Sequence, residues 1–235
     1  MSRWRFGGCT IRAPLRSTCS NIWSTASAEV LAPYLPKTAE LHHLENAIDW
    51  QRPAPADPAR HDTILYIGRL DREKGVLLLA DAVERLGMRA TFVGEGPLRP
   101  QLENRTGINL TGWVERDEVR RHLAEARCVV FPSLWYETYG LVVAEAAAYG
   151  VPTIVSDITA AAERVEDGVT GWLFRSGDRD DLIRCLEKTK YDEAIAQAGA
   201  AAYAQFWSQP TTSADHAADL LKIYRRILTL RPRMS

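Results

Sequence analysis

Two short segments of the sequence combine charged side chains with glycines directly after apolar runs. The first, Gly68-Arg69-Leu70-Asp71-Arg72-Glu73-Lys74-Gly75, follows the apolar run 63–67 and precedes a predicted helix. Arg69 offers a planar fork of donors and Lys74 a point charge, a combination that suits a diphosphate. The free amides and the positive dipole of the helix N-terminus would add to this attraction. The segment therefore predicts a phosphate site, and an ordinary solvated loop of mixed charge is the alternative.

The second segment, Glu137-Thr138-Tyr139-Gly140-Leu141-Val142-Val143-Ala144-Glu145, follows the apolar run 128–131 and a Pro-Ser turn. A carboxylate accepts two hydrogen bonds side by side, so Glu137 and Glu145 each suit a vicinal diol of a sugar or ribose. Gly140 has no Cβ and would let a ligand approach the amides of the turn. The alternative is one acid favoured by the helix dipole and one exposed helical acid.

These segments need elements that position them, and from residue 62 onward short apolar runs alternate with amphipathic stretches. This pattern predicts βαβ units, and runs without polar alternation are typical of strands buried on both faces. We expect an α/β fold, a Rossmann-like parallel sheet with helices on both faces. The predicted strands are 63–67, 90–93, 108–110, 128–131, 153–155 and 172–174. The predicted helices are 76–86, 115–126, 141–149 and 178–187.

The ends of this block mark boundaries. Pro53, Pro55 and Pro58 disfavour both helix and strand, so residues 51–61 are predicted to form a linker. Apolar residues recur at helical spacing over 217–228, which predicts a closing amphipathic helix. With 235 residues the chain is too short for two complete Rossmann-type halves.

Composition excludes several classes of function. A net charge of -1 argues against a nucleic-acid binder, and the sequence contains no run of about 18 apolar residues that could span a bilayer. The four cysteines form no CxxC motif, and His42 and His43 would point to opposite faces of a strand, so we predict no metal.

We expect a cytoplasmic protein. The basic start, with arginines at positions 3, 5, 12 and 16, is interpreted as a solvated arm or the remnant of a missing domain. Peripheral contact with an anionic membrane surface is an alternative for this segment.

The two charged segments resemble the signature of the retaining glycosyltransferases of family 4 (group 1), in which G-R-L-x-x-x-K-G and E-x7-E edge the donor pocket. Shorter motifs occur in the order of that family: Asn46-Ala47-Ile48-Asp49, Gly94-Glu95-Gly96-Pro97-Leu98, Pro132-Ser133 and Gly150-Val151-Pro152. The resemblance covers residues 24 to 228. It implies the C-terminal, donor-binding half of a two-domain GT-B fold. One departure is Ile158-Thr159-Ala160-Ala161-Ala162-Glu163, where the family often has a glycine-rich turn.

The resemblance also implies roles for single residues. Arg69 and Lys74 would bind the donor diphosphate, Glu137 the sugar hydroxyls and Glu145 the ribose; we group Arg69, Lys74 and Glu137 as the catalytic set. The other implied donor-binding residues are Gly68, Trp113, Val114, Tyr139, Gly140 and Leu141. For Trp113 a place in the core is the alternative. No metal or cofactor is implied beside the nucleotide-diphosphate sugar, which is the donor substrate.

The resemblance also divides the chain. Residues 1–50 would be a remnant of the N-terminal domain with the interdomain segment, 62–210 the nucleotide-sugar-binding domain, and 211–235 a crossover helix. The predicted reaction is sugar transfer to an acceptor with retention, by a truncated chain. The alternative is a non-catalytic nucleotide-sugar-binding subunit, or an inactive fragment, that needs a separate acceptor-binding domain or chain.

Asp178-Arg179-Asp180 is interpreted as a helix cap rather than a metal site. A dinucleotide-dependent oxidoreductase is disfavoured because Gly94-Glu95-Gly96 lacks the third glycine.

Overall fold

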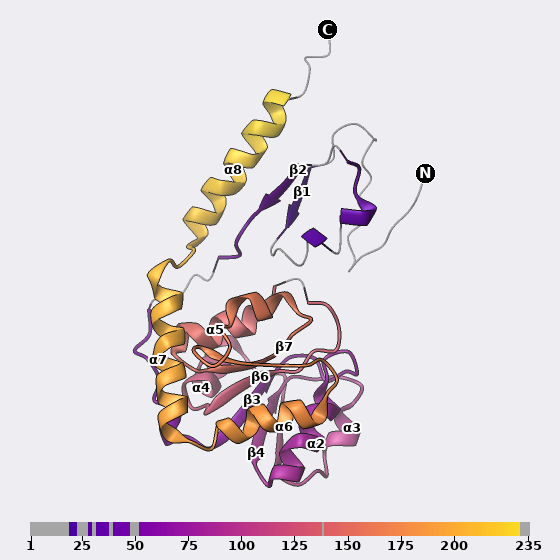
Figure 1. Cartoon of the computed structure of the whole chain (residues 1–235), viewed down its shortest axis with the longest axis vertical. Helices are drawn as coiled ribbons and strands as arrows, with labels where there is room; N and C mark the ends of the chain where they lie inside the picture. The colour runs from indigo at the N-terminus through magenta and orange to yellow at the C-terminus, as the bar shows by residue number, and fades with distance from the viewer. Residues whose placement is uncertain are drawn as a thin grey trace. The chain divides into compact units, whose positions relative to one another are not determined.

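The structure is a computed structural model that describes residues 19–22, 28–29, 32–37, 40–47, 52–137 and 139–230 (Figure 1). The chain divides into two compact units, one of residues 1–46 with 214–235 and one of residues 47–213. The basic segment 3–16, residues 48–51 of the predicted motif and linker, Thr138 of the second charged segment, and residues 231–235 lie outside the described residues.

A six-stranded parallel sheet forms the centre of the larger unit. Its strands are β3 (Thr63–Ile67), β4 (Arg89–Val93), β5 (Ile108–Gly112), β6 (Cys128–Phe131), β7 (Thr153–Ser156) and β8 (Gly171–Phe174), in the order β5-β4-β3-β6-β7-β8. The chain builds outward from β3 in one direction, returns to pair β6 with β3, and then builds the other way. The loops after β3 and β6 therefore leave at a topological switch point, where ligands bind in open α/β sheets.

Helices cover both faces of this sheet, as predicted (Figure 1). One face carries α2 (Val76–Leu86), the short α3 (Arg99–Leu102) and α6 (Arg179–Lys188), and the other carries α4 (Arg116–Ala124) and α5 (Leu141–Tyr149). Alternate strand residues serve the two faces. Ile64 and Tyr66 of β3 pack in the cluster that includes α2, whereas Leu65 between them packs on the opposite side.

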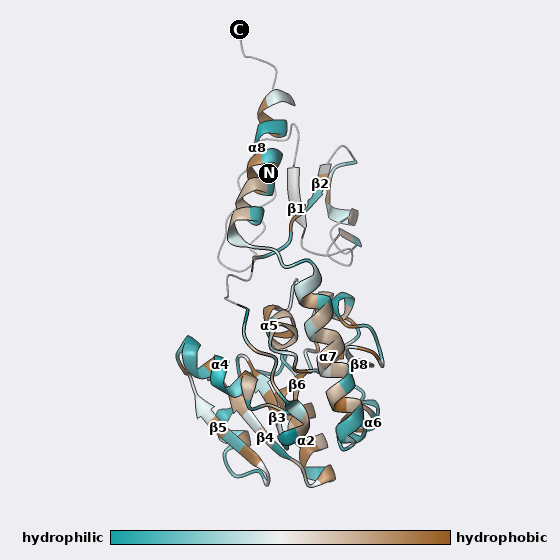
Figure 2. Cartoon of the chain, turned by 90° about the vertical axis from the view of Figure 1, so that its left-hand side faces the viewer, coloured by the Kyte–Doolittle hydropathy of each residue, from teal (hydrophilic) through white to brown (hydrophobic). Residues whose placement is uncertain are grey.

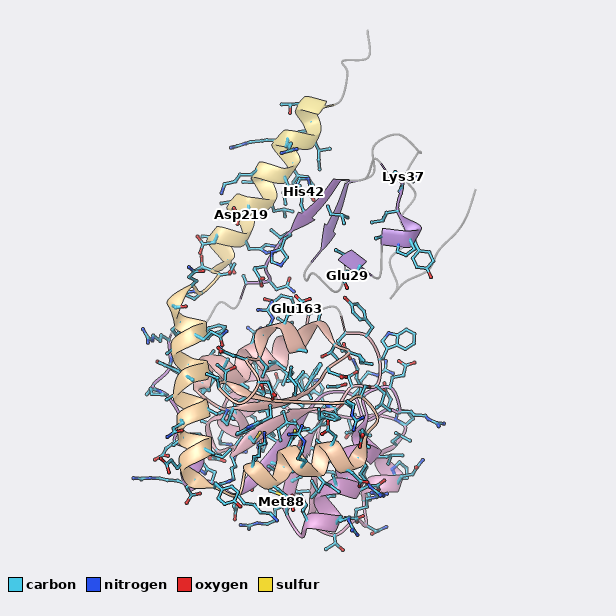
Figure 3. The ribbon with its side chains drawn as sticks, viewed as in Figure 1. Glu29, Lys37, His42, Met88, Glu163 and Asp219 are labelled. Carbon is cyan, nitrogen blue, oxygen red and sulfur yellow. The ribbon has the colours of Figure 1, made fainter. Side chains whose placement is uncertain are left out.

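The two helices of the second face differ in polarity (Figure 2). α4 is mostly hydrophilic, whereas α5 is apolar because it lies between the sheet and α7 (Asp192–Ser208), against which it packs. The 3-10 turn η3 (Ala160–Arg164) lies on the same face of the sheet as α5. Its residue Glu163 and the residue Met88, which packs against the α2 cluster, lie on opposite sides of the sheet (Figure 3).

Strands 63–67 and 128–131 and helices 76–86 and 141–149 have the predicted bounds, and the other predicted strands and helices of this unit differ by one or two residues at one or both ends. Helix α7 was not predicted, and neither were α3 and the 3-10 turn η2 (Pro58–Arg60) within the linker.

The smaller unit contains two short parallel strands, β1 (Cys19–Ile22) and β2 (Glu40–His43), which pair from Cys19 with Glu40 to Ile22 with His43. It also contains the 3-10 turn η1 (Ala32–Tyr34) and the amphipathic α8 (Ser213–Leu230). The His216 ring Nδ1 lies 2.6 Å from the Glu45 carbonyl oxygen. Within the described residues, every helix is too short or too polar to cross a bilayer.

Candidate active site

The loops that follow β3 and β6 meet at the carboxyl edge of the sheet. Gly75 has a positive φ of 68°, and a Cβ added there would lie 1.9 Å from the Pro132 carbonyl oxygen. The Leu134 N–H donates to the Glu73 carbonyl oxygen at 2.8 Å. Because only glycine allows the backbones to come this close, the two charged segments identified from sequence are held in direct contact.

The Lys74 ammonium and the Glu137 carboxylate form an ion pair across this junction. Both side chains are partly exposed, 31% for Lys74 and 20% for Glu137, so a ligand can reach them. The Ser133 hydroxyl lies 3.1 Å from Glu137 Oε1 and 3.2 Å from the Glu73 carbonyl oxygen. The fold thus brings together a cation and an acid that are far apart in the sequence.

Asp71 organises the β3 loop. One carboxylate oxygen pairs with the Arg69 guanidinium at 2.5 Å, and the other accepts the Lys74 N–H at 3.0 Å. The Arg69 side chain is 73% exposed, whereas that of Asp71 is only 10% exposed. The buried acid therefore anchors the loop and leaves the guanidinium available at the surface.

Tyr66 supports the same loop from below. Its buried hydroxyl donates to the Arg69 carbonyl oxygen at 2.7 Å. Burial, followed by the negative charges of Asp71 and Glu137, raises the pKa of Tyr66, so the phenol stays a hydrogen-bond donor.

The Gly94-Glu95-Gly96 segment after β4 braces the β3 loop. A Cβ at Gly94 would lie 2.0 Å from the Gly68 carbonyl oxygen, and one at Gly96 2.4 Å from that of Leu70. The Leu70 N–H donates to the Glu95 carbonyl oxygen at 2.9 Å. These glycines are therefore explained by the close approach of two backbones.

On the other side, η3 packs against the loop before α5. Gly140 has a φ of 75°, and a Cβ added there would lie 2.4 Å from the Ala161 Cβ. The Ala160 N–H donates to the Glu137 carbonyl oxygen at 3.0 Å. The alanines of η3 thus fill the space beside Gly140, which gives this glycine a packing role that the sequence did not indicate.

Two more predicted donor-binding residues flank Gly140. Tyr139 is 7% exposed, and the Arg164 guanidinium lies 4.0 Å from the centre of its ring. Leu141, the first residue of α5, is 47% exposed. The side chain of Tyr139 is therefore part of the packing, and a ligand would meet this turn through its backbone.

Glu145 lies inside α5, on the side of α4. Burial raises the pKa of Glu145, and the positive charges of Arg116 and Arg120 on α4 oppose this effect. In the part of the chain that the structure describes, Glu145 makes no hydrogen bond or ion pair with Arg69, Lys74 or Glu137. The structure therefore joins three of the four charged groups and leaves the fourth beside α4.

The residues after β5 are divided between surface and core. Trp113 is 71% exposed, so its interpretation as a core side chain is wrong: it stands beyond the end of β5, outside the layer that α4 covers. Val114 is half-buried and packs against the cluster that contains Leu65 and Val93.

Among the described residues, no group of three or more His, Cys, Asp or Glu side chains could hold a metal ion. The Asp178 carboxylate accepts the Asp181 N–H at 3.0 Å as the N-cap of α6. This confirms the capping interpretation of the D-x-D segment.

Three contributors to the site were not predicted: Tyr66, Asp71 and Ser133. Asp71 lies within the first charged segment. An aspartate whose carboxylate accepts the backbone N–H of the residue three positions later is a common turn signal, and Asp71 with Lys74 fits it. Ser133 was noted only as part of a motif. Tyr66 looked like any apolar strand residue, and nothing in the sequence showed that its hydroxyl faces the loop.

Solved structures share this arrangement of sheet and helices, a Rossmann-like α/β fold that matches GT-B glycosyltransferase structures. Sucrose-phosphate synthase from Thermosynechococcus elongatus superposes with a TM-score of 0.79 at 20% identity, covering 91% of this chain and 59% of that one. The HepE protein of Anabaena, in complex with UDP and glucose, gives a TM-score of 0.71 at 20% identity, covering 89% and 63%.

The sequence identifies the family. Residues 61–190, more than half of the chain, match Glycosyl transferases group 1, and the chain belongs to this family of glycosyltransferases. It is 32% identical over 203 residues to glycogen synthase of Mycobacterium tuberculosis, covering 80% of this chain and 48% of the relative. Alpha-D-kanosaminyltransferase of Streptomyces kanamyceticus is 29% identical over 150 residues, 57% of this chain and 39% of the relative. The chain thus spans about half, or less, of the length of these relatives.

Proposed function

We propose that this glycosyltransferase takes a sugar from a nucleotide-diphosphate donor and transfers it to an acceptor with retention of configuration, as family 4 enzymes do. The observation that carries the proposal is the Lys74–Glu137 ion pair at the switch point. It sets a cation suited to phosphate beside an acid suited to sugar hydroxyls. The complex of HepE with UDP and glucose supports a donor of this chemical class.

In this proposal, Arg69 and Lys74 bind the diphosphate and neutralise the charge that develops on it as the bond to the sugar breaks. Glu137 accepts hydrogen bonds from the sugar. Lys74 and Glu137 form an ion pair with one another, so donor binding exchanges one ion pair for two ligand contacts.

The remaining predicted residues would complete the donor site. The amides of Tyr139, Gly140 and Leu141 face sugar and phosphate from the start of α5, where the helix dipole is positive. The backbone of Gly68 belongs to the phosphate loop, Glu145 binds the ribose, and Trp113 with Val114 borders the base. We assign donor binding to residues 62–210 and a crossover role to the helix within 211–235.

Calorimetry with UDP, GDP and ADP and their sugars tests the donor site. We expect Lys74→Ala to weaken binding of the preferred nucleotide by about 1.5–3 kcal/mol, the range for hydrogen bonds to charged groups. Lys190→Ala, which removes an exposed lysine after α6, is the matched control and should bind normally. Equal affinity in Lys74→Ala and the wild-type chain would remove the phosphate assignment.

The alternative is a non-catalytic nucleotide-sugar-binding subunit that works with a separate acceptor-binding chain. Donor hydrolysis or sugar transfer by the purified chain argues for the enzyme. Tight donor binding without turnover, with turnover restored by an added acceptor-domain chain, argues for the subunit.

A further inference from the structure

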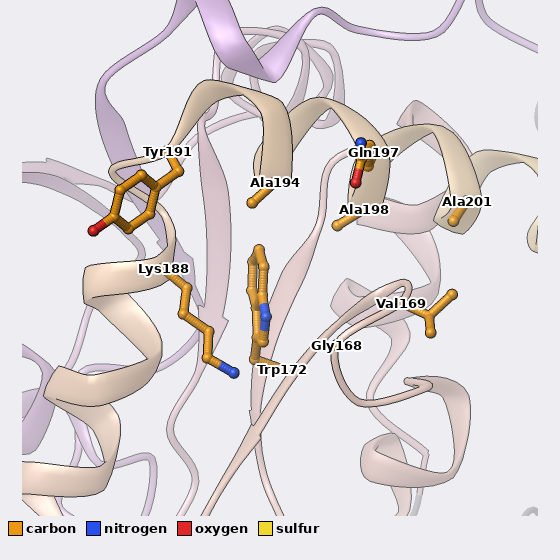
Figure 4. Close-up of a pocket in the computed structure, with 9 residues that line it drawn as sticks. All are labelled: Gly168, Val169, Trp172, Lys188, Tyr191, Ala194, Gln197, Ala198 and Ala201. Carbon is orange, nitrogen blue, oxygen red and sulfur yellow. The ribbon is translucent and has the colours of Figure 1, made fainter.

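A pocket lies at the amino edge of the sheet, the edge opposite the loops after β3 and β6. It has a volume of about 380 Å³, and we call it the α7 pocket (Figure 4). Gly168 and Val169, which precede β8, line one side, and Lys188, the last residue of α6, lines another. Its volume is in the range of small-molecule sites, and its position separates it from the proposed donor site.

The pocket contains two hydrogen-bond donors without protein acceptors. Trp172 is 4% exposed, yet its indole N–H donates to no acceptor in the described part of the chain. This nitrogen is not among the fully enclosed unpaired atoms, so its small exposed area opens on the pocket that Trp172 lines. A buried indole N–H ordinarily has a partner, and here the available partner would be a ligand.

The second donor is the Lys188 ammonium, which forms no ion pair with any described residue. Its side chain points toward Trp172 in Figure 4. None of the residues that line the pocket carries a carboxylate. The pocket therefore presents a positive charge and an N–H group with no negative charge of its own to meet them.

The opposite wall is apolar and formed by small side chains. Ala194, Ala198 and Ala201 follow one another at helical spacing on the face of α7 that lines the pocket. The Trp172 ring extends toward Ala194 (Figure 4) and packs in one cluster with Ala198, so these two side chains are buried against one another. The apolar surface that a ligand can reach belongs to the more exposed lining residues, Val169 and Tyr191.

We propose that the α7 pocket binds a small organic carboxylate with a flat apolar body. The carboxylate accepts from the Lys188 ammonium and the Trp172 indole N–H, and the body lies against the exposed apolar lining, Val169 and Tyr191. This site is independent of the donor crevice, and its occupation requires no residue of the β3 or β6 loop.

Nitrogen-15 NMR of the full chain tests the proposal through the indole N–H signals, with Trp172→Phe identifying the signal of Trp172. Millimolar benzoate is expected to move that signal. Benzamide has the same shape without the charge, and acetate has the charge without the ring, so both should move it far less. No movement with benzoate, or an equal response to benzamide, would overturn the proposal.

Calorimetry gives a second measurement that does not depend on the folding of Trp172→Phe. Lys188→Met keeps the apolar stem and removes the charge, so benzoate should bind about tenfold more weakly, as loss of one charged hydrogen bond predicts. Lys190→Met, which changes an exposed lysine outside the pocket, should bind benzoate normally. Equal benzoate affinity in the two variants contradicts the site, and affinity for UDP should be the same in both.

Discussion

The Ser133 hydroxyl belongs to one of the two parts of the proposed donor site, the part that would bind the sugar and not the part that would bind the diphosphate. Three oxygens lie within 3.2 Å of its Oγ: the carbonyls of Glu73 and Trp135 and the Glu137 carboxylate. A serine has one proton to donate, and a carboxylate is the strongest of the three acceptors. Ser133 therefore orients Glu137, the proposed sugar ligand, and forms no hydrogen bond with the proposed phosphate ligands Arg69 and Lys74.

This leads to a prediction for Ser133→Ala. We expect its affinity for the preferred nucleotide sugar to fall by about 0.5–1.5 kcal/mol, the net worth of one hydrogen bond. Its affinity for the nucleoside diphosphate without sugar should not change. Lys74→Ala is the counterpart, because it should weaken both ligands equally. Calorimetry with both ligands decides the matter, and an equal loss for the two in Ser133→Ala would show that the serine only supports the loop.

Glu145 is predicted to reduce stability at neutral pH. Burial raises the pKa of its carboxyl, so the folded state retains the proton to a higher pH than the unfolded state. Stability from this group is therefore intact below its ordinary pKa and falls as the pH rises through the folded value. An acid kept at such a cost is a candidate for function rather than for stability.

Glu145→Gln should accordingly raise the free energy of unfolding at about pH 7 and have little effect at about pH 3, where both states are protonated. The same variant should bind the nucleotide more weakly if Glu145 holds the ribose. Urea titrations at the two pH values provide the measurement, with exposed Glu187→Gln on α6 as the control. A destabilised Glu145→Gln at neutral pH would mean that Arg116 and Arg120 outweigh burial.

At the scale of elements, the start of α5 depends on a glycine that η3 holds in place. Gly140→Ala would place a Cβ 2.4 Å from that of Ala161 and force a side chain into a positive φ. We expect a loss of about 2–5 kcal/mol from strain and overpacking together. Gly87→Ala at the end of α2 shares the positive φ but has open space around it, so it should lose only the conformational part.

The double variant Gly140→Ala/Ala161→Gly separates the two costs. Removing the Ala161 methyl relieves the contact but not the backbone strain, so stability should recover to about the level of the Gly87→Ala loss. Urea unfolding of the three variants measures this. If the double variant is no more stable than Gly140→Ala alone, η3 does not set the position of the loop.

Sequence patterns predicted the strands and most helices of the larger unit because buried parallel strands and amphipathic helices differ strongly in their periodicity. They missed α7 because it is rich in alanine and contacts α5 with small side chains, so its apolar residues show little contrast with its other face. Its alanines are nonetheless strong helix formers, and that signal was available.

The candidate site was predictable only in part. Charge and glycine spacing placed Arg69, Lys74 and Glu137 at one edge, because parallel strands deliver their following loops to the same side of the sheet. The exposure of Trp113 and the direction of Glu145 toward α4 were not predictable. Both depend on how α4 lies over the sheet, which local sequence does not encode.

At the scale of the whole larger unit, one buried arginine joins three distant segments. Arg127, just before β6, is 7% exposed. Its guanidinium donates to the carbonyl oxygens of Ala59 and His61 in the segment before β3, and to that of Thr189 between α6 and α7. It also pairs with Asp192 at the start of α7 at 2.6 Å. The entry to the sheet and the last two helices of this unit therefore meet at one side chain.

Arg127→Met tests whether these contacts hold the unit together. The variant keeps the stem but leaves three carbonyl groups without their donor, and we expect it to lose about 2–5 kcal/mol of unfolding free energy. Arg89→Met is the matched control. Arg89 pairs with Asp62 at the surface, where both side chains are more than half exposed, so it should lose at most about 1 kcal/mol. Because Arg127 lies at the amino edge of the sheet, folded Arg127→Met should bind the nucleotide normally, and a loss of affinity without a loss of stability would contradict this role.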